Sequence, residues 1–366
     1  MKLDVSLVEK VGFNPYYNAK EKRDFIDLAS NNYLGLAQNC RSIEASIAAT
    51  REYGTSLCGT PIATGYIDLF RKVEQQLSSF VGLEETILFP SCYQANNGIF
   101  ALLVDEESLI VIDRYAHSSL MQGVMAAKAK ISPFLHNDID HLEKILSRNV
   151  EYQKIFVVTE SVFSTEGSIV PLDEIIYLCR KFDAIPVVDD SHGIGVLGKH
   201  GKGVLEYFGV DDFPGIYTAS LGKAIAGSGG MVSGKKHIIE FLRHYCPQLI
   251  YSTAITPGIL GGIVGALDVI ERDFDILKGK MWHYKDRISE VLPNESKGQT
   301  PIHSVLTGSA EATLMLSKKL YEHKILSTPF IEPSVPKNSG VVRLIAGAGL
   351  TEEQVDQAVV GIQECL

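Results

Sequence analysis

Residues 185–192 read Ile-Pro-Val-Val-Asp-Asp-Ser-His, four apolar residues followed directly by two carboxylates, a hydroxyl and an imidazole. Residues 172–182, just before them, repeat apolar side chains at helical spacing. A helix followed by a short apolar strand is the repeating unit of an α/β domain with a mainly parallel sheet. The stretch therefore predicts a buried parallel strand that ends in reactive side chains.

The same alternation of helices and strands extends toward the N-terminus. We expect strands over residues 86–89, 109–112, 131–135 and 155–158, and helices over residues 69–80, 94–103, 118–129 and 140–147. No Pro/Gly/Ser-rich linker and no fixed-period repeat interrupts this region. The sequence predicts an α/β large domain over residues 36–250, with a mainly parallel sheet between helices.

The remaining residues predict two smaller parts. Helical periodicity over 259–273, a strand-like run at 341–345 and a closing helix from 351 indicate a smaller C-terminal α+β domain over residues 251–366. Residues 1–35 are too few for a domain, and we expect them to form an N-terminal arm against the body or a neighbouring subunit.

Composition excludes several classes of function. The 366-residue chain has a formal net charge of -10 and no basic cluster interleaved with aromatic residues, which argues against a nucleic-acid partner. Its six cysteines lie far apart without a CxxC pair, so we expect no disulfide framework and no metal site, and a reducing cytoplasmic setting. The longest apolar stretch is far shorter than a membrane span, so we expect no membrane insertion.

Polar residues follow each predicted strand, and in open α/β sheets ligands bind beyond the carboxyl ends of the strands. These residues are Ser91, Cys92 and Tyr93 after the first strand, residues 113–117 after the second, residues 160–164 after the fourth, residues 189–192 after the fifth, and Ser220 to Lys223 after the short run 215–217. We expect them to meet at one edge of the sheet.

This set of side chains matches what pyridoxal 5′-phosphate requires from a protein: an amine, a carboxylate, a flat group against the ring and phosphate donors. Lys223, in a Gly-flanked turn, is the candidate amine for the cofactor's aldehyde. Asp189 is the candidate partner of the ring nitrogen. His192 is placed to bond the phenolic oxygen, and His117 offers an imidazole face for stacking.

Each of these residues alone has a simpler explanation. A strand-end Asp189 with His192 also suits a loop hydrogen-bond pair, a lysine after glycine is usually a solvated surface residue, and a single His117 is more often structural. Only their arrangement at successive strand ends favours a cofactor site.

The motifs that carry these residues resemble those of the α-oxoamine synthases, fold type I pyridoxal-phosphate enzymes that include 8-amino-7-oxononanoate synthase. The resemblance runs along nearly the whole chain. Its motifs are residues 30–36 (SNNYLGL), 91–96 (SCYQAN), 113–119 (DRYAHSS), 162–172, 189–193 (DDSHG), 220–224 (SLGKA), 251–257 (YSTAITP) and Arg343.

The resemblance implies a reaction and a role for each matching residue. The reaction is condensation of an α-amino acid with an acyl-CoA or acyl-carrier-protein thioester, with loss of carbon dioxide, to an α-aminoketone. Lys223, His117 and His192 would be catalytic, and Asn31 and Arg343 would bind substrate. The cofactor would be bound by the three catalytic residues Lys223, His117 and His192. Its other contacts would be Asp189, Cys92, Tyr93, Ser164, Ser220, Ser252 and Thr253. The resemblance also implies a homodimer whose active sites lie at the interface, with Ser252 and Thr253 reaching the neighbour's phosphate.

Departures from the family pattern leave the substrates open. Cys92 replaces the usual Gly of the phosphate-side turn, which removes the freedom for a positive φ there. Phe70 stands where many relatives carry His, and the arm lacks an obvious Arg for a dicarboxylic acyl chain. Residues 133–142 also resemble a second branch of the family, which makes long-chain α-aminoketone signals.

Rival classes differ in how well the motifs fit them. Ala224 after Lys223 and Tyr217 at the position of the first glycine argue against a P-loop nucleotide hydrolase. No G-x-G-x-x-G follows a first strand and no G-x-S-x-G elbow is present, which argues against a Rossmann dehydrogenase and a serine hydrolase. An aminotransferase or a lyase with the same cofactor, and a non-catalytic binding protein on this fold, remain the alternatives.

Overall fold

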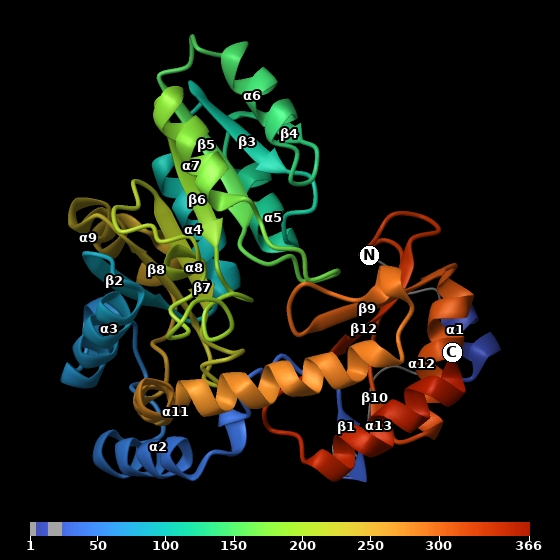
Figure 1. Cartoon of the computed structure of the whole chain (residues 1–366). Coiled ribbons are helices and arrows are strands. Elements are labelled where there is room, and N and C mark those ends of the chain that lie inside the picture. Colours follow the sequence, from blue (N-terminus) through green and yellow to red (C-terminus); the bar gives the residue numbers. More distant parts are fainter. Residues whose placement is uncertain (1–4, 14–23) are drawn as a thin grey trace. The chain divides into compact units, whose positions relative to one another are not determined.

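The computed structural model describes residues 5–13 and 24–366 (Figure 1). The chain forms two compact units. We call residues 36–163 and 169–274 the large unit, and residues 1–35, 164–168 and 275–366 the small unit. The predicted boundary at 250 differs from this division, which falls inside one long helix, and residues 1–35 group with the C-terminal part. Residues 1–4 and 14–23 of the predicted arm lie outside the described residues.

A seven-stranded sheet in the order β2-β8-β7-β6-β5-β3-β4 forms the centre of the large unit. β7, β6, β5, β3 and β4 run parallel to one another, whereas β8 is antiparallel to both β7 and β2. The strands are β2 (Glu85–Phe89), β3 (Ser108–Asp113), β4 (Lys130–Phe134), β5 (Lys154–Glu160), β6 (Ala184–Asp189), β7 (Ile216–Ser220) and β8 (Gly230–Gly234). The mainly parallel sheet is therefore as predicted.

Burial explains the composition of these strands. All six residues of β3 are buried, and in β5 only the first residue is exposed. Strands covered on both faces read as continuous apolar runs rather than alternating ones, and both strands have that pattern. The main core cluster joins them to the helices through Ile99, Leu120 and Leu242.

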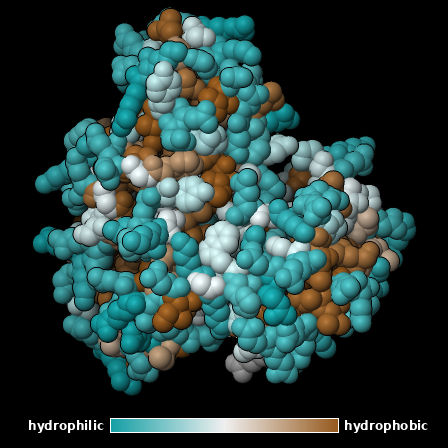
Figure 2. All heavy atoms as spheres, in the orientation of Figure 1, coloured by the Kyte–Doolittle hydropathy of each residue, from teal (hydrophilic) through white to brown (hydrophobic). Residues whose placement is uncertain are grey.

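Helices follow most of the strands of the large unit and are visible around its sheet in Figure 1. They are α2 (Cys40–Tyr53), α3 (Asp68–Val81), α4 (Cys92–Leu103), α5 (Ser118–Ala126), α6 (Ile139–Ser147), α7 (Leu172–Lys181), α8 (Val204–Tyr207), α9 (Lys236–Tyr245), α10 (Pro247–Ile250) and the start of α11 (Pro257–Glu290). Short turns at η2 (Leu36–Gln38) and η3 (Pro61–Gly65) complete the unit. Hydrophilic residues cover much of its surface in Figure 2, with apolar atoms showing between them.

The small unit combines short sheets with helices, as predicted for the C-terminal α+β domain. β11 (Thr328–Phe330), β12 (Gly340–Ile345) and β9 (Ile302–Gly308) form an antiparallel sheet, and β1 (Ile26–Asp27) pairs in parallel with β10 (Ile325–Leu326). The helices are α1 (Val5–Val11), the end of α11, α12 (Ala310–Glu322) and α13 (Glu352–Cys365), with a turn at η4 (Asn294–Ser296). Thr351 begins α13 with a capping box to Gln354.

Among the described helices, none combines the length and apolar character needed to span a lipid bilayer.

Candidate active site

Three neighbouring strands of the large unit end in polar side chains at matching positions. In the sheet register, Glu160 of β5 pairs with Asp189 of β6, and Asp189 pairs with Thr218 of β7. All three residues are at least 96% buried, with exposed fractions of 3%, 4% and 0%. Parallel pairing thus collects the residues after these strands at one edge of the sheet, as the sequence predicts.

The carboxylate of Asp189 is held by two strong donors. Its Oδ2 accepts a 2.7 Å hydrogen bond from Nδ2 of Asn96, and its Oδ1 accepts a 3.0 Å bond from the backbone N–H of Ser191. The Cys92 Sγ lies 3.9 Å from the same Oδ2. Two donors of this kind fix the position of the carboxylate at the end of β6.

His117 caps the N-terminus of α5 and lies within electrostatic range of Asp189 and Lys223. Its backbone N–H donates to Oε1 of Glu160 at 2.6 Å, and its Nδ1 accepts from the backbone N–H of Ser119 at 3.2 Å. Burial lowers the pKa of the His117 imidazole, the charge of Lys223 lowers it further, and Asp189 opposes both. His117 is therefore neutral near pH 7.

Lys223 lies in a closed loop between β7 and β8 and is half-buried. The Leu221 N–H donates to Gly229 O at 3.0 Å, and the Gly227 N–H donates back to Leu221 O at 2.8 Å. Gly229 has a φ of +101°, a conformation that favours glycine, so it closes this loop without strain. Lys223 and Asp189 both act on the pKa of Cys92 as well, so the amine and the carboxylate border the same small region.

Cys92 is the first residue of α4, whose N-cap is Ser91. Its φ is not positive, so a glycine is not required at this position and the departure from the family pattern introduces no strain. A glycine is required opposite it, because a Cβ on Gly230 of β8 would lie 2.3 Å from the Cys92 Cα. Burial, followed by the charge of Asp189, raises the pKa of the Cys92 thiol.

The loop after β6 is fastened by Asp190, a residue whose role the sequence did not reveal. Asp190 Oδ2 accepts hydrogen bonds from the Tyr217 hydroxyl at 2.7 Å and the Val204 N–H at 2.9 Å. Burial raises the pKa of Asp190 to about 7. His192, two residues further, is 4% exposed and lies in the turn that Asp190 fixes.

Four further predicted residues lie in the large unit around the start of α4 or the end of β7. Ser252 Oγ accepts from Nε2 of Gln94 at 2.9 Å, which joins the segment 251–254 to the first turn of α4. Tyr93 is 40% exposed and its hydroxyl donates to Gln122. Ser220 ends β7 and its Oγ accepts from the Gly222 N–H at 3.3 Å, whereas Thr253 is exposed.

Arg343 and Ser164 meet in the small unit. Nη1 of Arg343 donates to the Ser164 backbone oxygen at 2.9 Å, and the guanidinium lies over the Phe330 ring at 4.9 Å. Arg343 is 7% exposed, and its Nε has no hydrogen-bond partner among the described residues. The Oδ1 of Asn31 is likewise buried without such a partner in the described part of the chain. The Arg343 Nε–H, a buried donor on a charged group, suits an anionic ligand.

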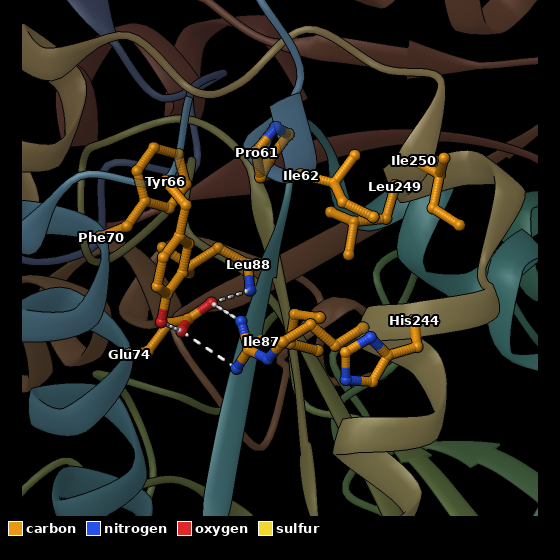
Figure 3. Close-up of a pocket in the computed structure, with 11 residues that line it drawn as sticks. Pro61, Ile62, Tyr66, Phe70, Glu74, Ile87, Leu88, His244, Leu249 and Ile250 are labelled. Carbon is orange, nitrogen blue, oxygen red and sulfur yellow. Dashed lines mark hydrogen bonds and ion pairs between the residues drawn. The ribbon is translucent and has the colours of Figure 1, made fainter. Parts of the chain in front are cut away.

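A separate pocket in the large unit was not predicted. It has a volume of about 280 Å³ and is lined by apolar side chains including Ile62, Leu88 and Leu249 (Figure 3). On one wall the Arg243 guanidinium pairs with the Glu74 carboxylate at 3.1 Å. None of the predicted site residues lines this pocket.

Asn96 is the main residue of the site that sequence reasoning did not assign to a role. In the sequence it appears only as the last residue of the motif 91–96. Its position four residues after Cys92 was the available signal, because residues four apart share one face of a helix.

Comparisons with known proteins identify the family. The family model described as aminotransferase class I and II matches residues 23–362. The 8-amino-7-oxononanoate synthase of Symbiobacterium thermophilum is 33% identical over 342 residues, which cover 92% of this chain and 87% of that protein. The chain belongs to the α-oxoamine synthase family.

Solved structures agree with this family assignment. A serine palmitoyltransferase variant from S. paucimobilis with a bound PLP–myriocin aldimine has a TM-score of 0.89 at 23% identity, with 93% of this chain and 87% of that chain covered. The 8-amino-7-oxononanoate synthase of Francisella tularensis has a TM-score of 0.79 at 28% identity, with 93% and 98% covered. These likenesses confirm the predicted fold type I architecture. This α-oxoamine synthase is thus a pyridoxal-phosphate-dependent acyltransferase.

The residues of the large unit fit the cofactor. A buried carboxylate held by two donors, a half-buried lysine and a neutral imidazole act on one another electrostatically at the strand ends. The N-terminus of the 12-residue helix α4 supplies backbone N–H groups of the kind that bind phosphate.

Proposed function

We propose that this α-oxoamine synthase condenses a small α-amino acid with an acyl thioester and releases carbon dioxide, as an 8-amino-7-oxononanoate synthase does. The single observation that carries the proposal is the meeting of Asp189, His117 and Lys223 at the carboxyl edge of the sheet. Several relatives named 8-amino-7-oxononanoate synthase, at 31–33% identity over more than 90% of the chain, support the assignment of the substrates.

The proposed roles follow from the chemistry of each side chain. When bound, pyridoxal phosphate supplies an electron sink for negative charge at the α-carbon of the amino acid. The Lys223 amine binds the cofactor and then moves the proton at that α-carbon. Asp189 holds the proton on the ring nitrogen, and His117 packs on the ring. His192 bonds the phenolic oxygen.

Further residues would hold the phosphate and the substrates. Cys92, Tyr93, Ser164 and Ser220, with the N-terminus of α4, are the proposed contacts of the cofactor and its phosphate. Arg343, whose Nε has no hydrogen-bond partner among the described residues, is the proposed partner of the amino acid's carboxylate, and Asn31 the proposed contact of the substrate.

The chain is further proposed to act as a homodimer in a reducing cytoplasm. Ser252 and Thr253 would then reach the phosphate of the neighbouring subunit. The 84% exposure of Tyr251 beside them supports a surface that a second copy covers. The free state of all six cysteines is consistent with a reducing compartment. Light scattering of the purified chain tests the dimer, and a monomer at micromolar concentration would contradict it.

The reaction is tested by supplying amino acids and acyl thioesters in a matrix. Glycine, alanine, serine and 2-aminobutyrate are combined with short, dicarboxylic and long acyl chains, on both CoA and acyl carrier protein. Stoichiometric release of carbon dioxide and free thiol is the expected result. A preference for long monocarboxylic chains would favour the α-aminoketone signal branch instead.

An aminotransferase is the second candidate function, because the matching family model carries that description. The same assay separates the two reactions. Formation of a 2-oxo acid without thiol release would establish transamination and overturn the proposed condensation.

A further inference from the structure

A buried amide connects the two groups proposed to flank the cofactor ring. Asn96 is completely buried, and its Nδ2 donates to Asp189 Oδ2 at 2.7 Å and to the Ser119 Oγ at 2.9 Å. Its Oδ1 accepts from the Thr218 hydroxyl at 2.8 Å. One NH₂ group thus contacts the carboxylate directly and approaches His117 through a hydroxyl.

The orientation of this amide is fixed. In the flipped orientation, the Asn96 oxygen would face an oxygen of the Asp189 carboxylate at 2.7 Å, and two acceptors repel at that distance. The flipped nitrogen would face the Thr218 hydroxyl, which would lose its acceptor. The carboxylate contact selects the orientation in which the amide donates to Asp189, and the Thr218 hydroxyl, which can donate or accept, is satisfied in that orientation.

The next hydrogen bond joins the Ser119 hydroxyl to His117, and its direction follows from the amide together with the Ser119 backbone N–H. The Ser119 hydroxyl accepts from Asn96, so its single hydrogen is available for the His117 Nδ1, which lies 2.8 Å away. The same Nδ1 also accepts the Ser119 backbone N–H at 3.2 Å. A nitrogen that accepts two hydrogen bonds cannot carry a proton, so the ring proton of His117 is on Nε2.

We propose that Asn96 is a positioning residue that fixes both the carboxylate of Asp189 and, through the Ser119 hydroxyl, the tautomer of His117. We call the hydrogen-bonded series Asp189, Asn96, Ser119 and His117 the relay, and its catalytic role rests on the proposed function. The relay itself concerns only the protons of the protein and stands without it. Asn96 would hold the carboxylate of Asp189 in place and leave Nε2 as the only N–H donor of the stacking imidazole.

The test is the tautomer of His117 in the full-length chain, purified with its cofactor and labelled with ¹⁵N in histidine. A His117→Gln variant assigns the signal among the ten histidines. In the wild type at about pH 8, where the imidazole is neutral, Nδ1 is expected to be unprotonated and Nε2 protonated. A proton on Nδ1 of the wild-type ring would overturn the proposal without any variant.

Asn96→Asp is expected to reverse the relay. Two carboxyl groups this close share one proton, and the new side chain donates that proton to Asp189. The Ser119 hydroxyl then donates to residue 96 and accepts from His117 across the shorter, 2.8 Å contact. The ring proton moves from Nε2 to Nδ1, and the longer, 3.2 Å bond from the Ser119 backbone N–H is lost. In the double variant Asn96→Asp with Ser119→Ala the hydroxyl is missing, and the proton is expected back on Nε2.

A matched control is Gln122→Glu, which makes the same amide-to-carboxylate change on α5 while keeping the oxygen that accepts from Tyr93. This control should leave the His117 signal unchanged. The proposal is wrong if Asn96→Asp leaves the proton on Nε2, or if the double variant shows the same switch as the single one. A tautomer switch in a chain that fails the condensation assay would contradict the proposed function and leave this inference intact.

Discussion

At the scale of single residues, the site depends on how Asp189 is held. Its two oxygens accept hydrogen bonds from a side-chain amide and a backbone N–H, at 2.7 and 3.0 Å. Such bonds stabilise negative charge in a place that is 4% exposed. The chemistry proposed for the ring nitrogen therefore depends on a charge and not only on a shape.

Asp189→Asn tests this dependence. The substitution keeps the shape of the side chain and removes its charge, so the ring nitrogen loses its proton and the electron sink weakens. We expect kcat to fall by about 10²- to 10⁴-fold in the condensation assay, while the chain remains folded. Asp211→Asn, a change of the same kind at an exposed residue, is the control. Equal activity of the two variants would contradict the role of Asp189.

The reactivity of Cys92 is a second prediction at this scale. Burial and the nearby Asp189 raise the pKa of its thiol, whereas Cys40 and Cys58 are exposed. Because the thiolate is the reactive form, iodoacetamide at pH 8 should modify Cys40 and Cys58 well before Cys92. Peptide mass spectrometry over time measures the order, and early labelling of Cys92 would show that its surroundings are not as described.

The sequence predicts the ends of the strands, but not the contacts behind them. Asp189 and Lys223 could be found because each follows a short apolar run. The link from Asn96 to Asp189 could not, because it joins residues 93 positions apart through a helix packed on the sheet. Asp190 could not be given a role of its own for the same reason, since its partners Tyr217 and Val204 come from later segments.

At the scale of elements, an ion pair attaches α9 to α3 beneath the strand β2. Glu74 is 4% exposed, and it receives bonds from Arg243 and from the Leu88 N–H of β2 (Figure 3). Burial raises the pKa of Glu74 although Arg243 acts in the opposite direction. Burying the pair therefore costs desolvation free energy. Its effect on the stability of the fold is seen mainly when one partner is removed and the other charge stays buried.

Arg243→Met should destabilise the chain because it leaves the Glu74 carboxylate buried without its cation. The expected loss is about 2–4 kcal/mol, somewhat below the value for a fully buried pair because the Arg243 side chain is 22% exposed. Adding Glu74→Met should restore part of the loss. Urea denaturation of the single and double variants measures both, and a double variant that is less stable than either single variant would contradict this account.

Most elements of the large unit could be predicted from periodicity, with ends within three residues. The helix expected at 69–80 is α3 at Asp68–Val81, and the strand expected at 185–188 is β6 at Ala184–Asp189. β8 was not predicted, because Gly230–Gly234 contains two glycines and little β-branched sequence. Its antiparallel pairing with β2 and β7, and not its own propensity, makes it a strand.

At the scale of the whole chain, the two units are not consecutive in sequence. Residues 164–168 and 1–35 belong to the small unit together with residues 275–366. The helical pattern at 259–273 suggested a new domain near 251, but α11 continues to Glu290 and the division falls within it. Periodicity identifies a helix and cannot show which of its halves packs on which core.

A buried histidine of the small unit predicts how stability depends on pH. His303 is fully buried, its Nδ1 accepts from the Gly298 N–H at 3.1 Å, and burial lowers its pKa from 6.5 to about 4. Between pH 6.5 and about pH 4, His303 therefore binds a proton in the unfolded chain but stays neutral in the folded chain. The stabilising contribution is complete above pH 6.5, falls as the pH drops toward 4, and totals about 3 kcal/mol.

The difference in unfolding free energy between wild type and His303→Gln isolates this contribution. It should shrink by about 1.4 kcal/mol per pH unit between pH 6 and 4.5 and become constant below about pH 4. Urea denaturation at a series of pH values measures it. A difference that does not change between pH 7 and 4 would show that the native His303 takes up its proton normally.

The central claim is that the amine at 223 binds the cofactor beside the carboxylate of Asp189. The most direct measurement is borohydride reduction of the purified yellow protein, followed by digestion and mass spectrometry of every lysine-containing peptide. We expect loss of the visible absorption band and one pyridoxyl phosphate group, on the Nζ of Lys223. Modification of another lysine, or a colourless protein that takes up no cofactor, would contradict the account.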